Sequence, residues 1–116
     1  EEEMDVNLKS KDVNYKAKVC DDFFSKLRGL MFSKKLGKGE CIILSNDHES
    51  RINSSIHMLF VFFSLDVIFL DSEKKVVDIR RAKPFVSLIT PRRRAQHVVE
   101  MNAWENRLKI GDKVSF

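Results

Sequence analysis

The chain has 116 residues, of which 43% are hydrophobic and 33% are charged. This length and balance predict one ordinary globular domain over residues 1–116, large enough to bury a core without disulfides or metal ions to hold it. The formal net charge of +4 is uneven, because residues 1–78 carry 12 Lys and Arg against 14 Asp and Glu, whereas residues 79–116 carry 9 against 3. The basic last third favours an anionic partner, such as nucleic acid or a membrane surface.

No segment has the character of a membrane span or of a signal peptide. The longest apolar stretch, residues 58–70, is interrupted by Ser64 and Asp66 and is shorter than the roughly 20 residues that a span needs. The sequence opens with three glutamates, whereas a secretory signal opens with positive charge and continues into an apolar region. We therefore expect a soluble cytoplasmic protein, with an exported, processed form as the alternative.

The first half of the chain shows two patterns typical of strands. Residues 4–10 and 15–20 alternate polar and apolar side chains, which predicts two half-buried strands joined by a turn at 11–14. Residues 41–44 form a short, continuous apolar run, which is typical of a strand covered on both faces. The polar residues 45–54 that follow predict a surface loop.

One helix is expected between these strands. Asp21 and Asp22 provide a cap and favourable charge for its first turn. Its apolar stripe follows helical spacing and consists of Phe23, Leu27, Leu30 and Met31.

The centre of the fold is expected in residues 55–71. Residues 58–63 are β-prone and apolar on both alternating faces, which predicts a central strand. A bend at 64–65 leads into a second strand at 66–71, and the polar turn at 72–75 leads into a third strand that begins at 76–79.

The last third predicts shorter elements. Pro84 and Pro91 bracket a stretch that cannot lie centrally in a sheet. Residues 97–101 form a strand pattern, residues 103–109 fit a helical turn or two that presents Trp104 and Leu108 together, and residues 113–116 fit a last strand. We therefore predict a mainly β fold: a small, barrel-like antiparallel sheet of about seven strands, with one helix in the N-terminal half and a short C-terminal helical turn.

Several stretches, in this order and spacing, resemble a known family. They are Arg28-Gly29-Leu30-Met31-Phe32, residues 56–71 with their Leu65-Asp66 and Phe69, Val76-Val77, Lys83-Pro84, Val99-Glu100, and Ile110-Gly111-Asp112-Lys113-Val114. The sequence resembles the uncharacterised ancient conserved region family, domain of unknown function number 192, from about residue 21 onward. The resemblance implies a compact β-rich fold with a helix near the front, and it implies no established activity.

The chain departs from the family pattern at three places. Many members read Trp-Met-Lys-Asn-Thr where this chain has residues 57–61, and a Pro where it has Ser64. A Gly commonly follows the late Glu-x-x-Ala, whereas Trp104 follows Ala103 here. If the family's Lys-Asn pair serves a ligand, this chain lacks that pair.

Three residues are candidates for acid–base chemistry. Asp66 lies within an apolar stretch, where a carboxylate is costly to bury without partners. It serves either as a catalytic or ligand-orienting group with His57 or Glu100, or as a structural acceptor of backbone N–H groups at the bend before it. His57 is also readable as a partly buried structural histidine, and hairpin pairing would hold it away from Asp66.

The spacing of the other reactive side chains favours neither a metal site nor nucleophilic catalysis. His48 lies in a polar segment with two acids, and Cys20 and Cys41 have neither metal-ligand spacing nor the density of a disulfide framework. We expect two reduced, partly buried thiols, with a single disulfide as the alternative in an exported form. The sequence predicts no metal and no cofactor.

Two basic runs flank the proline-bracketed stretch and give the candidate ligand-binding residues. Guanidinium groups can engage phosphate or carboxylate bidentately, and the alternative is a solvated basic face. The six candidates are Arg80, Arg81, Lys83, Arg92, Arg93 and Arg94.

These observations favour a non-enzymatic binding module over an enzyme. We expect it to engage a small anionic ligand or a protein partner through loops at one end of the barrel. The alternatives are nucleic-acid binding through the basic runs at 80–83 and 92–94, and an enzyme that uses Asp66 with His57 or Glu100.

Overall fold

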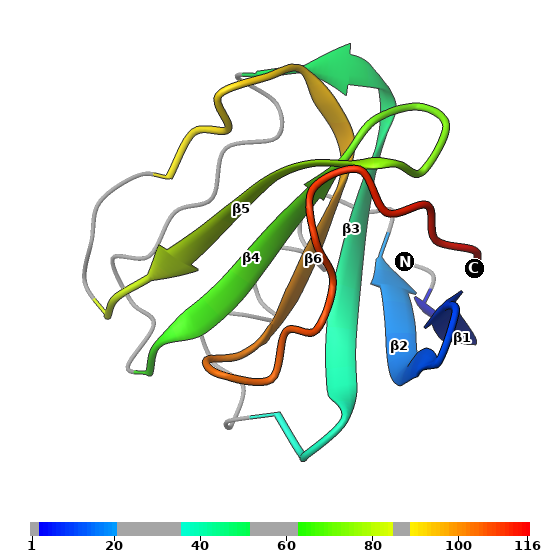
Figure 1. Cartoon of the computed structure of the whole chain (residues 1–116), viewed down its shortest axis with the longest axis vertical. Helices are drawn as coiled ribbons and strands as arrows, with labels where there is room; N and C mark the ends of the chain where they lie inside the picture. Colours follow the sequence, from blue (N-terminus) through cyan, green and yellow to red (C-terminus); the bar gives the residue numbers. More distant parts are fainter. Residues whose placement is uncertain (1–2, 21–35, 52–62, 85–88) are drawn as a thin grey trace.

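The computed structural model describes residues 3–20, 36–51, 63–84 and 89–116 (Figure 1). These residues form one six-stranded sheet in the order β1-β2-β3-β6-β4-β5. All neighbouring strands are antiparallel except β2 and β3, which are parallel. The strands are β1 (Glu3–Ser10), β2 (Val13–Cys20), β3 (Glu40–Ser50), β4 (Leu65–Leu70), β5 (Val76–Ala82) and β6 (Ala95–Asn102).

The predicted N-terminal hairpin is confirmed. β1 and β2 pair in the register Leu8–Tyr15 and are joined by a tight turn whose Lys11 has a φ of 52°. Leu8, Tyr15 and Ala17 are buried while their strand neighbours Asn7, Lys9, Asn14, Lys16 and Lys18 are exposed, so the polar and apolar alternation sorts these side chains as expected.

The predicted hairpin at residues 66–79 is also confirmed. β4 pairs with β5 on one side and with β6 on the other, and all six of its residues are buried. A strand pair joined by the short turn at Asp71–Lys75 explains the polar sequence between the two apolar runs. The strand predicted at 97–101 is β6, which lies between β3 and β4.

The sheet separates two hydrophobic clusters because successive residues of a strand point to opposite faces. We name the faces after two neighbouring residues of β4. The Val67 face carries Ile42, Leu44, Leu65, Val67, Phe69 and Val98. The Ile68 face carries Cys41, Ile43, Ile68, Leu70, Val99 and Met101.

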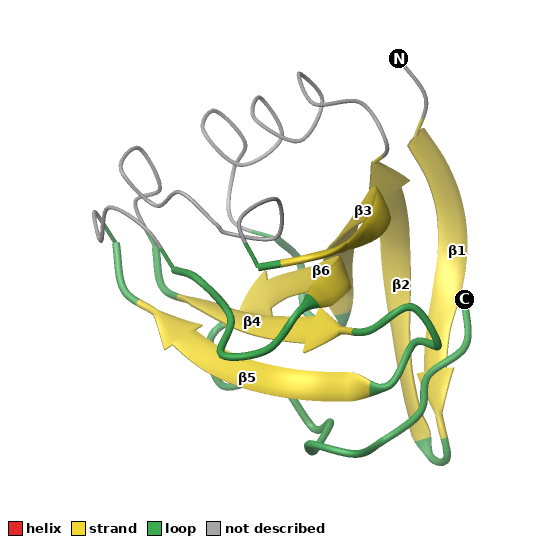
Figure 2. Ribbon diagram, turned by 90° about the horizontal axis from the view of Figure 1, so that it is seen from above, coloured by secondary structure: helices red, strands yellow, loops and turns green. Residues whose placement is uncertain are grey.

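The prediction of a small, barrel-like antiparallel sheet of about seven strands is wrong. The sheet has six strands, one strand pair is parallel, and its edge strands β1 and β5 do not pair with each other. The sheet is instead strongly bent, so that β1 and β2 lie across the direction of β4 and β5 (Figure 2). Local alternation does not reveal this arrangement, because the β2–β3 pairing joins segments separated by a long connection.

The C-terminal segment links the two ends of this bent sheet. Instead of the strand predicted at 113–116, it makes two isolated bridges, from Lys113 to Lys75 and from Ser115 to Lys9. The amide of Ser115 donates to the carbonyl of Lys9 at 2.9 Å, and the amide of Lys9 donates back at 3.0 Å. These contacts satisfy part of the outer edge of β1.

Two further predictions fail. The helical turn expected at 103–109 is a turn at Ala103-Trp104 followed by an irregular segment, in which Leu108 is 3% exposed and Trp104 is 84% exposed. Residues 45–50 of the expected surface loop belong to β3, whose pairing with β6 is irregular between Ser45 and Ser50. Pairing with β6 thus holds residues 45–50 in a strand although their polar composition is typical of a loop.

Other expectations lie outside the described residues. They include the helix from residue 21, the strand at 58–62, and residues 52–54 of the expected loop. Phe63, the last residue of that predicted strand, is in a bend. Within the ranges that the structure describes, no helix has the length and apolar character needed to cross a membrane.

Candidate functional site

Two polar side chains, Glu100 and Asn102, lie on the Val67 face at the centre of the sheet. Both come from β6, two residues apart, so they point to the same side of the strand. Glu100 lies directly between Ile42 of β3 and Val67 of β4, and Asn102 lies opposite Leu65. A carboxyl group and an amide therefore lie directly beside apolar side chains of the neighbouring strands.

Three oxygens of this pair lack hydrogen-bond partners. Glu100 is completely buried, Asn102 is 5% exposed, and neither Glu100 Oε1, Glu100 Oε2 nor Asn102 Oδ1 has a donor among the described residues. Asn102 Nδ2 donates to the carbonyl of Leu36, which fixes the orientation of its amide. Burial raises the pKa of the Glu100 carboxyl to about 8, so at neutral pH the protonated form predominates.

Asp66 faces the opposite side of the sheet, where it anchors Arg81. Arg81 Nε donates to Asp66 Oδ1 at 2.6 Å, and the Asp66 side chain is 3% exposed. Asp66 Oδ2 accepts a hydrogen bond from the backbone amide of Asn106 at 3.1 Å. Asp66 thus accepts a backbone hydrogen bond, as one of the two interpretations of the sequence expected. The donor, however, is an amide of the segment after β6 and not of the bend before Asp66.

Trp104 lies on top of this ion pair. The Arg81 guanidinium carbon is 3.7 Å from the centre of the indole ring, a cation–π distance. We call Trp104 and Arg81, together with the anchoring Asp66, the Trp104 platform. It presents a large aromatic side chain that remains 84% exposed although its position is fixed from below.

The backbone of Trp104 has a φ of 74°, in the left-handed region. This conformation favours glycine and is rare for a bulky residue. It also explains why the family pattern, in which Gly commonly follows Ala, fits this position. A tryptophan here therefore carries a conformational cost that its exposed surface does not repay through core packing.

The segment that carries Trp104 is tightly held. The Tyr15 hydroxyl donates to the Glu105 carbonyl at 2.6 Å and accepts from the Arg107 amide at 3.0 Å. The Gly39 amide donates to the Glu105 carboxylate at 2.9 Å. Burial raises the pKa of Tyr15 above its usual value, so its hydroxyl stays protonated as the donor that this arrangement needs.

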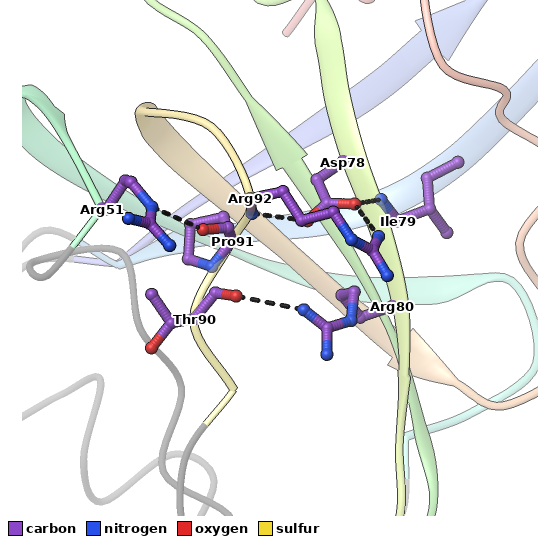
Figure 3. Close-up of polar contacts among 7 residues, drawn as sticks. All are labelled: Arg51, Asp78, Ile79, Arg80, Thr90, Pro91 and Arg92. Carbon is purple, nitrogen blue, oxygen red and sulfur yellow. Dashed lines mark hydrogen bonds and ion pairs between the residues drawn. The ribbon is translucent and has the colours of Figure 1, made fainter.

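A second buried carboxylate, Asp78, fastens the segment before β6 (Figure 3). Asp78 Oδ1 accepts from Arg92 Nη1 and from the Ile79 amide, each at 2.9 Å, and Asp78 Oδ2 accepts from the Arg92 amide at 2.8 Å. Arg80 donates to the carbonyl of Thr90 at 3.1 Å. Arg51 donates to the carbonyl of Pro91 at 3.0 Å.

The structure therefore divides the six predicted ligand-binding cations. Arg81 lies on the Ile68 face, whereas Arg80, its neighbour in β5, lies on the Val67 face. Arg80, Arg92 and Arg94 donate to backbone carbonyls or to Asp78. Lys83 and Arg93 are exposed and make no hydrogen bond or ion pair with any residue in the described ranges.

The acid–base candidates are not brought together. Val67 pairs with Glu100 and is the neighbour of Asp66, so Asp66 and Glu100 point to opposite faces of the sheet. His57 lies outside the described residues, and His48 is exposed on β3. The part of the chain that the structure describes contains no group of three His, Cys, Asp or Glu side chains arranged to hold a metal ion.

Sequence reasoning missed His97 and the exposure of Trp104. His97 is buried on β6, with Nδ1 2.9 Å from the Ser45 hydroxyl and its ring edge-on to Phe116. The sequence around His97 does not indicate these contacts, because Ser45 and Phe116 are far from it along the chain. For Trp104, the available signal was its place after Ala103, where the family commonly has Gly.

Cys41 is a free thiol, 2% exposed, and burial raises its pKa to about 12. We expect a disulfide-exchange reagent to label Cys41 in a Cys20→Ser variant about a thousandfold more slowly in the folded than in the unfolded state, because the thiolate is the reactive form. Stopped-flow labelling at pH 8, with and without denaturant, measures this ratio. Equal rates would contradict the buried position.

Comparison with known proteins identifies the family. The family model of DUF192, described as "Uncharacterized ACR", matches residues 5–116. The chain belongs to this family. A Pyrococcus abyssi UPF0127 protein is 35% identical over 112 residues, which cover 92% of both chains. A Thermococcus sibiricus UPF0127 protein is 41% identical over 85 residues, which cover 73% of this chain but 53% of the relative.

The fold of this DUF192 chain also matches solved structures. A Novosphingobium aromaticivorans protein of unknown function superposes with a TM-score of 0.82, at 21% identity, over 97% of this chain and 85% of the other. A Sinorhizobium meliloti protein described as a "putative transcription regulator" superposes with a TM-score of 0.83, at 18% identity, over 98% and 93%. At these identities the likeness concerns the fold alone.

Proposed function

We propose that this DUF192 chain is a binding module that contacts a negatively charged partner through the Trp104 platform. The observation that carries the proposal is an indole that is 84% exposed, held at a φ of 74° and stacked on an arginine that a buried aspartate anchors. Exposed, preorganised Trp and Arg side chains are typical anchors of binding surfaces.

The surroundings of the platform favour negative charge in the partner. Leu65 pairs with both Ala82 and Asn102, so Lys83 and Trp104 follow strand ends at the same end of the sheet. Lys83 is exposed, and so is Arg107 in the segment that carries Trp104. Together with Arg81 they place three cations at this end, which matches the basic last third of the sequence.

Trp104 is the only tryptophan of the chain, so its fluorescence reports on the platform directly. We expect poly-glutamate, inorganic phosphate or an oligothymidylate to change the Trp104 emission saturably at low salt, because a partner that covers the indole changes its solvent exposure. An emission that stays constant with all three probes would contradict the proposal.

Trp104→Gly provides the decisive variant. Glycine accepts the left-handed backbone, which offsets the loss of the stacking contact, so we expect a stability within about 1 kcal/mol of the wild type. We expect calorimetric binding of the active probe to weaken at least tenfold. Ile110→Ala removes another exposed apolar side chain and should leave binding unchanged; equal losses in both variants would point to general surface stickiness.

Single-stranded nucleic acid is the second candidate partner, and the Trp104 platform is what favours it. Proteins that bind single strands stack bases on aromatic side chains and track the backbone with cations. Oligothymidylate should then bind with an affinity that falls steeply as salt rises, because neutralised phosphates release counterions. Lys83→Ala, which removes an exposed cation at the Trp104 end of the sheet, should reduce that slope; salt-independent binding would exclude this partner.

A further inference from the structure

The buried pair of Glu100 and Asn102 calls for an explanation that the proposed function does not supply. Buried polar groups in proteins are nearly always hydrogen-bonded, and each exception needs a cause. Here three oxygens on one face lack donors from the described residues. The pair lies on the face of the sheet opposite to Asp66 and Arg81, so the Trp104 platform does not use it.

The chemistry of the pair specifies what is missing. Carboxylate and amide oxygens accept hydrogen bonds, and the side-chain N–H₂ group of Asn102 donates one hydrogen bond to the Leu36 carbonyl. The α-carbons of Glu100 and Asn102 are separated by about 7 Å, the rise of two strand residues. One group placed between the two side chains can therefore contact both of them.

Among the described residues, the strands beside Glu100 bring no compensating charge to it. Ile42 and Val67 flank Glu100 on β3 and β4. On the same face Arg80 lies one strand further and donates to Thr90, while Asp78 is engaged by Arg92. Glu40, at the exposed start of β3, accepts from the Gly37 amide at 2.8 Å.

We infer that Glu100 and Asn102 form a binding site for a primary ammonium group attached to a small apolar body. A primary ammonium has three N–H donors, which equals the number of unpartnered oxygens. Its positive charge pairs with the ionised carboxylate in a setting of low polarity, where such pairing is strong. Ile42, Leu65 and Val67 provide apolar surface for the hydrocarbon part.

Binding of an ammonium group at this site is coupled to release of the Glu100 carboxyl proton. Because burial holds the Glu100 pKa near 8, binding of an ammonium at neutral pH displaces the carboxyl proton. Below pH 8, apparent affinity should therefore increase as the pH rises, by up to about tenfold per pH unit. Because Glu100 is completely buried, association should be slower than simple docking to a surface.

Calorimetric titration with benzylammonium tests the inference. We expect saturable binding at pH 7 with release of close to one proton, measured in two buffers of different ionisation heat. Benzyltrimethylammonium has the charge without N–H donors, and benzyl alcohol has a donor without the charge; both should bind at least tenfold more weakly. A flat benzylammonium titration, as expected if an ordered water fills the site, overturns the inference.

Variants separate this site from the rest of the molecule. Glu100→Gln should abolish proton release and weaken benzylammonium binding at least tenfold, while Glu73→Gln, an exposed change in the β4–β5 turn, should alter neither. Unchanged binding by Glu100→Gln overturns the inference. Should that variant fail to fold, the wild-type comparison of benzylammonium with its trimethyl analogue still decides: equal affinity overturns the site. Trp104 emission is not used, so the outcome is independent of the proposed function.

Discussion

Glu100→Gln should become progressively more stable than the wild type as the pH rises from about 4.5 to about 8. In the unfolded chain the Glu100 carboxyl ionises near its ordinary pKa of 4.5, whereas burial raises its pKa to about 8 in the folded protein. The folded state therefore binds the Glu100 proton more tightly than the unfolded state does. The contribution of this proton to the free energy of unfolding is fully present below pH 4.5 and is lost as the pH rises through 8. The slope in this window is about 1.4 kcal/mol per pH unit for one proton.

Urea unfolding of both proteins between pH 4 and pH 9 measures this difference. Glutamine has the shape of the protonated carboxyl and does not titrate, so the stability difference isolates the ionisation of residue 100. Glu73→Gln is the matched control, because it removes an exposed carboxyl and should follow the wild type at every pH. A constant offset between Glu100→Gln and the wild type would show that residue 100 does not have the raised pKa.

Asp78→Ala should cost about 2–4 kcal/mol of unfolding free energy, because it removes a buried acceptor and leaves the donors that it satisfied unpaired. The Asp78 carboxylate is 2% exposed and accepts from the side chain of Arg92 and from the amides of Ile79 and Arg92. This substitution therefore removes both the backbone and the side-chain link from Arg92 to β5, and not the ion pair alone.

Arg92→Ala separates the two contributions. The Arg92 side chain is 69% exposed, and its backbone amide still reaches Asp78 after the substitution. We expect a loss of at most about 1 kcal/mol, as for exposed ion pairs. Chemical denaturation of both variants gives the comparison, and similar losses would mean that the ion pair, and not the backbone contacts, holds this segment.

The elements that were predicted correctly are those whose signal is local. Strands β1, β2, β4 and the start of β5 follow alternation or continuous apolar runs bounded by polar turns, and both hairpins join neighbours in sequence. The parallel pairing of β2 with β3 and the place of β6 between β3 and β4 depend on contacts between distant segments. No periodicity within one segment carries that information.

The same distinction applies to the candidate sites. Asp66 stood out because it is an acid in an apolar stretch, but its partners lie 15 and 40 residues away, at Arg81 and Asn106. Glu100 was named only as a possible partner of Asp66, and the absence of donors around it among the described residues depends on the strands at its sides. The helical spacing of Trp104 and Leu108 was misleading, because tethers to Tyr15 and Asp66 hold the segment in an irregular path.

The two bridges made by the C-terminal segment have a consequence for biosynthesis. The outer edge of β1 is contacted by Ser115, more than a hundred residues later in the chain. While the ribosome is still translating the β6 region, the β1–β2 hairpin has therefore already emerged from the exit tunnel, but the C-terminal segment that pairs with β1 has not yet been made. Closure of such a long loop comes late and slowly, so nascent chains should expose the β1 edge to chaperones until residues 113–115 emerge from the exit tunnel.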